Sequence, residues 1–106
     1  MTIDELRLLV ARGETEHVEF KRSTGNLSEG LKTVCAMLNG TRPGYVVFGV
    51  NDRSDLVGQE VSTRTLEDIA NNLRKIQPPC AHAVERETVN LENGRAVIVL
   101  RTCGDG

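Results

Sequence analysis

The chain has 106 residues, of which 39% are hydrophobic and 26% are charged, and its formal net charge is −2. This length predicts one domain with one hydrophobic core, and this apolar content excludes an intrinsically disordered protein. The slightly negative charge excludes a protein that coats DNA through bulk positive charge, although a local basic stripe is compatible with it.

Three cysteines are widely spaced and form no C-x-x-C pair, which favours a reducing compartment over a disulfide framework. The chain begins without the basic and apolar regions of a secretory signal. It also lacks an apolar run near the roughly 20 residues that a membrane helix needs. We therefore expect a cytoplasmic protein with no membrane partner.

The first predicted element is a helix over residues 3–12, with apolar residues at helical spacing. Thr2 and Glu5 before and within it have the spacing of a capping box. A short strand is predicted over residues 17–22, because apolar and charged residues alternate there. This pattern indicates a half-buried strand with a charged outer face.

A second helix is predicted over residues 27–38, with Gly40 as its stop. Residues 45–50 then form a continuous apolar run of strand formers. Such runs are typical of central strands that are covered on both faces. Residues 56–58 follow a polar turn and are expected to start a short edge strand.

A third helix is predicted after Thr65, as its N-cap, and is ended by Pro78–Pro79. Two strand-like runs follow, over residues 83–91 and 95–101. Asn93-Gly94 lies between them, and this dipeptide between two strands is a strong signal for a β-hairpin.

The order of these elements predicts an α+β domain, with a mostly antiparallel or mixed sheet and about three helices packed on it. Residues 1–106 are expected to form this single domain. The sequence stops abruptly after the last predicted strand. We interpret the chain as an N-terminal fragment of a longer protein.

Three carboxylates are the candidates for metal-dependent chemistry. Glu14 and Glu19 lie at the entry and on the outer face of the first predicted strand, and Asp52 follows the apolar strand. If the two strands are neighbours, these side chains could converge on a Mg²⁺ or Mn²⁺ ion. The alternative is that all three are solvated surface charges.

Four basic residues are candidates for binding a phosphate backbone: Lys21, Arg22, Arg42 and Arg53. The scarcity of aromatic residues argues against a platform on which bases stack. Contacts to the backbone are more compatible with this sequence. Here too the alternative is a scatter of solvated charges.

An ordered set of motifs resembles the Schlafen AlbA_2 family. Glu14 to Lys21 reads E-x-x-x-V-E-F-K, and Ala36 to Asn39 is followed by Gly44. The run from Tyr45 to Asp52 reads YVVFGVND, and Leu56 to Gly58 reads LVG. No single motif is decisive, but their order is fairly specific to this family.

The resemblance implies the fold class predicted above. Bacterial members are described as N-terminal domains of transcriptional regulators or DNA-binding proteins, whereas some animal members are endoribonucleases that use two Glu and one Asp. By motif match, those residues would be Glu14, Glu19 and Asp52. Asn51 stands where many members carry another Asp, which leaves Asp55 as a substitute for Asp52.

Three functions follow as hypotheses. The first is a nucleic-acid-binding domain of a transcriptional regulator, binding DNA or RNA. The second is an endoribonuclease that depends on Mg²⁺ or Mn²⁺. The third is a protein-interaction or dimerisation domain, and a homodimer is expected in each case.

Overall fold

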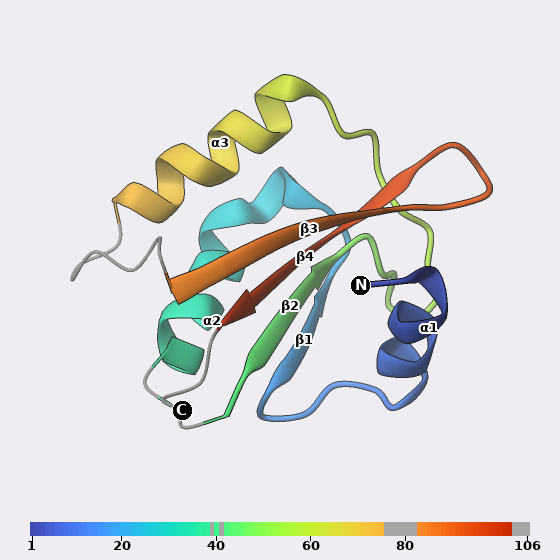
Figure 1. Cartoon of the computed structure of the whole chain (residues 1–106), viewed down its shortest axis with the longest axis horizontal. Helices are drawn as coiled ribbons and strands as arrows, with labels where there is room; N and C mark the ends of the chain where they lie inside the picture. The colour runs from blue at the N-terminus through green and yellow to red at the C-terminus, as the bar shows by residue number, and fades with distance from the viewer. Residues whose placement is uncertain (39, 41, 76–82, 103–106) are drawn as a thin grey trace.

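The computed structural model of the chain describes residues 1–38, 40, 42–75 and 83–102 (Figure 1). These residues form three α-helices and one four-stranded sheet. The elements are α1 (Ile3–Ala11), β1 (Val18–Lys21), the short 3-10 helix η1 (Thr24–Asn26), α2 (Leu27–Leu38), β2 (Gly44–Phe48), α3 (Thr63–Arg74), β3 (Val84–Asn90) and β4 (Ala96–Thr102).

The sheet has the strand order β1-β2-β4-β3. β1 runs parallel to β2, whereas β2 with β4 and β4 with β3 are antiparallel. The α+β class with a mixed sheet and three helices is therefore confirmed. Because β1 and β2 are parallel, their carboxyl ends lie side by side at one end of the sheet.

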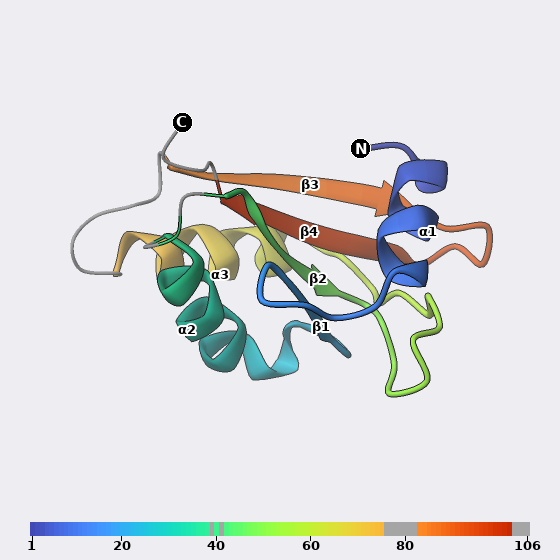
Figure 2. The ribbon, with the colours of Figure 1, turned by 90° about the horizontal axis from the view of Figure 1, so that it is seen from below.

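Helices cover both faces of this sheet, and Figure 2 shows α1 and α2 on opposite sides of it. The central strands β2 and β4 are apolar on both faces, as expected for strands with two covered sides. The core beneath α2 and α3 consists of Leu31, Val34, Met37, Val46, Phe48, Ile69, Leu73, Ile98 and Leu100. The core beneath α1 consists of Leu6, Val10, Val47, Val50, Val89, Val97 and Val99.

The observed N-cap agrees with the prediction in one helix and differs from it in another. In α1, the Thr2 hydroxyl accepts from the Glu5 N–H and the Glu5 carboxylate accepts from the Thr2 N–H, so the predicted capping box is confirmed. The prediction of Thr65 as the N-cap of α3 is wrong. Ser62 is the N-cap, and the Thr65 hydroxyl accepts from the Ser62 N–H in a reciprocal pair.

The remaining predictions of local structure are mostly confirmed. β3 and β4 form the predicted hairpin, and Gly94 at its turn has φ +82°. Its loop has a third residue besides Asn93-Gly94, because the Leu91 N–H donates to the carbonyl of Arg95. The predicted strand at residues 56–58 is wrong, since Leu56 forms only a single bridge with Val50. The predicted stop of α3 at Pro78–Pro79 lies outside the described residues.

A glycine within α2 sets the distance between this helix and β2. A methyl group on Gly30 would lie 2.6 Å from Cζ of Phe48, whose ring is fully buried. Glycine lowers helix propensity, but here it allows the helix to contact the ring directly. The close packing of α2 on β2 therefore depends on this residue.

Candidate functional site

The outer edge of β1 is covered by the chain segment that precedes it. Thr15 and Val18 exchange backbone hydrogen bonds of 3.0 and 3.4 Å. The Glu14 carboxylate accepts a hydrogen bond of 3.2 Å from the N–H of Phe20. Glu14, predicted as a catalytic and metal-binding residue, thus satisfies a backbone donor at the edge of the sheet.

Glu19 points from β1 toward α2. Its carboxylate accepts a hydrogen bond from the hydroxyl of Thr33 and lies 4.0 Å from Nζ of Lys21. Glu14 and Glu19 line one pocket of about 300 Å³, together with His17 and apolar atoms of α2. Two of the three predicted carboxylates therefore share a site.

Asp52 does not line that pocket. Its carboxylate accepts a hydrogen bond of 3.0 Å from the guanidinium of Arg22, beyond the end of β1. Asp55, the predicted substitute, accepts instead from the side chain of Asn51 within the following turn. Among residues 1–38, 40, 42–75 and 83–102, no three His, Cys, Asp or Glu side chains are placed to hold a metal ion. The predicted convergence of all three carboxylates on one metal ion is therefore not observed among these residues.

The four predicted phosphate-binding residues are divided between the two ends of the sheet. Arg22 and Arg53 follow the carboxyl ends of β1 and β2, which the parallel pairing places together. Arg42 precedes β2 and lies at the other end. Lys21 is half-buried and faces Glu19. The structure therefore brings Arg22 and Arg53 to one end of the sheet and separates Arg42 from them.

A basic groove, which sequence reasoning did not identify, lies at the end of the sheet that carries Arg22. It encloses about 540 Å³. Its two charged side chains are the exposed arginines Arg22 and Arg95, which come from distant parts of the chain. The groove is lined by Arg22, Ser23, Val57, Gly58, Gln59, Asn93 and Arg95.

Backbone geometry at Gly58 places Arg95 beside the groove. Gly58 has φ +70°, and a methyl group there would lie 3.0 Å from Cβ of Arg95. Asn93 fixes the hairpin turn, because its Nδ2 donates to the Val57 carbonyl at 3.2 Å and its Oδ1 accepts from the Arg95 N–H at 2.9 Å. The sequence predicted a turn at Asn93 and a short edge strand ending at Gly58, but it did not indicate that these two segments meet.

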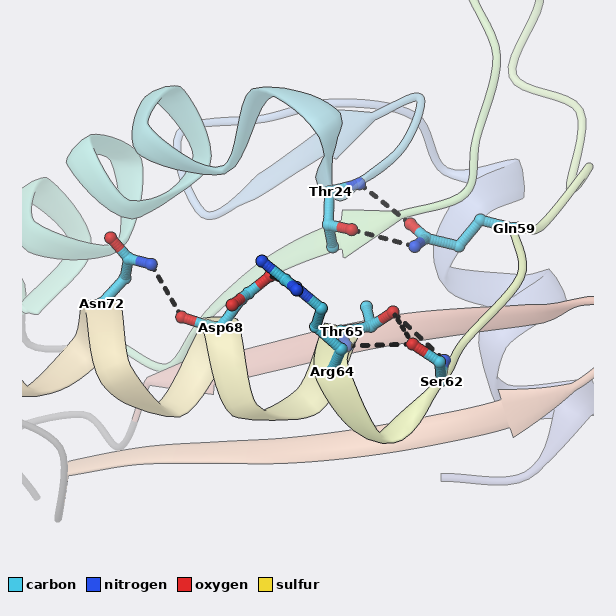
Figure 3. A network of polar contacts seen from close by, with 7 residues as sticks. All are labelled: Thr24, Gln59, Ser62, Arg64, Thr65, Asp68 and Asn72. Carbon is cyan, nitrogen blue, oxygen red and sulfur yellow. Dashed lines mark hydrogen bonds and ion pairs between the residues drawn. The ribbon is translucent and has the colours of Figure 1, made fainter.

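Gln59 forms the inner wall of the groove and is 8% exposed. Its backbone exchanges hydrogen bonds of 2.8 and 3.0 Å with Ala96, at the start of β4. Its side-chain amide accepts from the Thr24 N–H and donates to the Thr24 hydroxyl, both at 2.9 Å (Figure 3). Gln59 therefore connects the segment after β1 to the hairpin that carries Arg95.

Within the described ranges, every helix is too short or too polar to cross a membrane.

Comparison with known proteins identifies the family. The chain is similar to the N-terminal domain of a Nitrosomonas europaea protein described as related to the ATP-dependent DNA helicase RecG. The TM-score is 0.63 and the sequence identity 24%, and the match covers 97% of this chain and 72% of that one. At this identity the likeness demonstrates the shared fold.

A search of curated proteins found no match. The family model described as Schlafen, AlbA_2 matches residues 14–102. The resemblance in the motifs is thereby confirmed, and the chain belongs to the Schlafen AlbA_2 family.

Proposed function

We propose that this domain binds nucleic acid by holding the sugar–phosphate backbone in the basic groove. The observation that carries the proposal is that Arg22 and Arg95 both line this one groove. Guanidinium groups are well suited to phosphate oxygens, because their planar donors can bond two oxygens at once. The description of the structural neighbour as related to a DNA helicase supports the same class of ligand.

The environment of the groove favours contacts to the backbone over base reading. The side-chain amides of Gln59 and Asn93 are already engaged with Thr24 and Val57. The two arginines therefore supply the main charged donors for a ligand. Contacts of this kind fix a nucleic acid in place but carry little sequence information.

The charge of the whole chain is −2, so binding must come from this local feature. Arg22 already pairs with Asp52 at 3.0 Å, and both side chains are largely exposed. An exposed pair of this kind contributes little stability, so phosphate can displace the carboxylate at small cost. The proposal extends to a binding module of a cytoplasmic transcriptional regulator, a role that requires no catalysis.

The test is a binding titration of labelled duplex DNA, single-stranded DNA and RNA at several salt concentrations. Arg22→Ala and Arg95→Ala should each weaken binding and lower the slope of log affinity against log salt by about 1. Arg74→Ala is the matched control, because Arg74 is exposed at the far end of α3, where its guanidinium donates to the side chain of Asn71. If the double variant Arg22→Ala/Arg95→Ala binds every ligand as tightly as Arg74→Ala, the proposal is wrong.

A metal-dependent endoribonuclease is the second candidate, favoured because Glu14 and Glu19 line one pocket. Asp52 lies outside it, so binding is the better supported function. Incubation with transfer RNA and Mn²⁺ decides between the two. Cleavage that is lost in Glu19→Gln would support the nuclease.

The predicted homodimer is a separate proposal. Analytical sedimentation of the natural chain at several protein concentrations would test it.

A further inference from the structure

A second groove adjoins the basic groove. It lies between η1, the start of α2 and the exposed side of α3, and it encloses about 330 Å³. We call it the α2–α3 groove; it is lined by Thr24, Leu27, Ser62, Arg64, Thr65, Asp68 and Asn72. Thr24 lines this groove and is hydrogen-bonded to Gln59, which lines the basic groove. The contact between Thr24 and Gln59, which Figure 3 shows, therefore links the two grooves.

The α2–α3 groove differs from the basic groove in charge. Arg64 and Asp68 lie one helical turn apart on α3, with Nε and Oδ2 separated by 4.0 Å. Their side chains are 88% and 57% exposed, so both remain accessible to a ligand. Among the described residues, this groove is lined by one acidic and one basic side chain, whereas the basic groove is lined by two arginines and no carboxylate, so a phosphate backbone is attracted less here than there.

The polar groups suit the edge of a nucleobase instead. Asp68 offers two acceptor oxygens and Arg64 offers donors, side by side. The Asn72 amide donates to the backbone carbonyl of Asp68 at 2.7 Å, which leaves its carbonyl oxygen as the end that can accept. Leu27 is half-buried and provides an apolar wall for a flat ring.

We propose that the domain prefers single-stranded nucleic acid and takes one unpaired base into the α2–α3 groove. Asp68 accepts hydrogen bonds from the N–H groups of the base, while the neighbouring phosphate lies against Arg22 and Arg95. A base with two adjacent N–H donors, as guanine has at N1 and N2, fits a carboxylate best. In a duplex this edge is engaged in pairing, so the groove selects a single strand. This inference rests on the proposed function, because the basic groove must hold the adjacent phosphate.

The experiment compares three labelled ligands: an all-thymine strand, the same strand with one central guanine, and the guanine strand in a duplex. The natural chain should bind the guanine strand about fivefold or more tightly than either other ligand. Asp68→Asn and Arg64→Ala should abolish this preference. Glu67→Gln removes one negative charge from the residue that precedes Asp68 in α3, and this variant should keep the preference for the guanine strand. Thermal unfolding of each variant establishes that these exposed substitutions leave the fold intact.

The outcomes separate the two proposals. Equal binding of the three ligands by the natural chain, or a preference that persists in Asp68→Asn, overturns the single-strand inference. If, in that case, the double variant Arg22→Ala/Arg95→Ala still binds all three ligands more weakly than the natural chain, the proposed function is retained and only the single-strand inference is rejected. If that variant has no effect although the guanine preference depends on Asp68, the proposed function is wrong, and the part of the inference that places the neighbouring phosphate against Arg22 and Arg95 is overturned with it.

Discussion

The carboxylate of Glu14 accepts a hydrogen bond from the backbone N–H of Phe20, at 3.2 Å, on the outer edge of β1. An edge strand exposes donors and acceptors that can pair with another chain, and natural proteins cover them. Here Thr15 pairs with Val18 and Glu14 engages the next donor on this edge. The residue that family resemblance assigns to catalysis thus has a structural role as well.

Glu14→Ala should lower the free energy of unfolding by about 1 kcal/mol, because a backbone donor loses its partner. Glu14→Gln should lose less, since an amide oxygen still accepts. Urea unfolding measures both, with Glu16→Ala as the control at an exposed neighbouring carboxylate. Equal stability of Glu14→Ala and Glu16→Ala would contradict a role of Glu14 at the edge.

Gln59→Ala should lower the free energy of unfolding by about 1–3 kcal/mol, because it removes the partners of Thr24 and opens space in a buried position. The comparison is Glu60→Ala, whose side chain is exposed. Chemical denaturation of the two variants provides the measurement. A loss that is the same in both would show that the bonds to Thr24 add no stability.

Gly30→Ala should destabilise the chain by about 1–3 kcal/mol although alanine favours helices, because the new methyl group would meet the ring of Phe48. Ser28→Ala, on the exposed side of α2, should be close to neutral. In a chain that already carries Phe48→Leu, the ring is absent, so Gly30→Ala should cost less stability than it does in the natural chain. Thermal melting of the four chains tests this; a stabilising Gly30→Ala would refute the contact.

The capping box of α1 should make stability depend on pH. Hydrogen bonds from the backbone N–H and the side chain of Thr2 hold the pKa of Glu5 below its ordinary value. The folded state therefore favours the ionised carboxylate. This contribution is present above the usual carboxyl pKa of about 4.3 and is lost as the pH falls through the lower pKa of the folded state. The stability difference between the natural chain and Glu5→Gln should shrink along that descent, as melting temperatures at successive pH values will reveal. A constant difference would mean that the pKa of Glu5 is the same in the folded and unfolded states.

The sequence predicts the parts of this molecule that depend on near neighbours. Periodicity located all three helices and the four strands, and Asn93-Gly94 located the hairpin. Ser62 was missed as an N-cap, because Ser62 and Thr65 both carry capping hydroxyls and residue type alone does not distinguish them. Leu56 pairs at a single point, since the chain turns toward Ala96 through Gln59.

The candidate site was predicted less completely for the same reason. Glu14 and Glu19 share a pocket because they belong to one short segment of the chain. Asp52 and Arg22 meet through the parallel pairing of β1 with β2, which no local pattern specifies. Arg95 was missed, because its place beside Arg22 depends on the close approach of the hairpin to Gly58.

That close approach also bears on how such a domain could change its ligand. Gly58 lines the basic groove, and a methyl group on it would lie 2.8 Å from Cδ1 of Leu91 in the hairpin. The main chain at this position therefore packs directly against the hairpin and leaves no room for a side chain. Arg22 and Arg95 are exposed, and the guanidinium of Arg22 contacts the likewise exposed carboxylate of Asp52 on this surface, so a new selectivity can arise by exchanging either arginine without rebuilding what lies beneath.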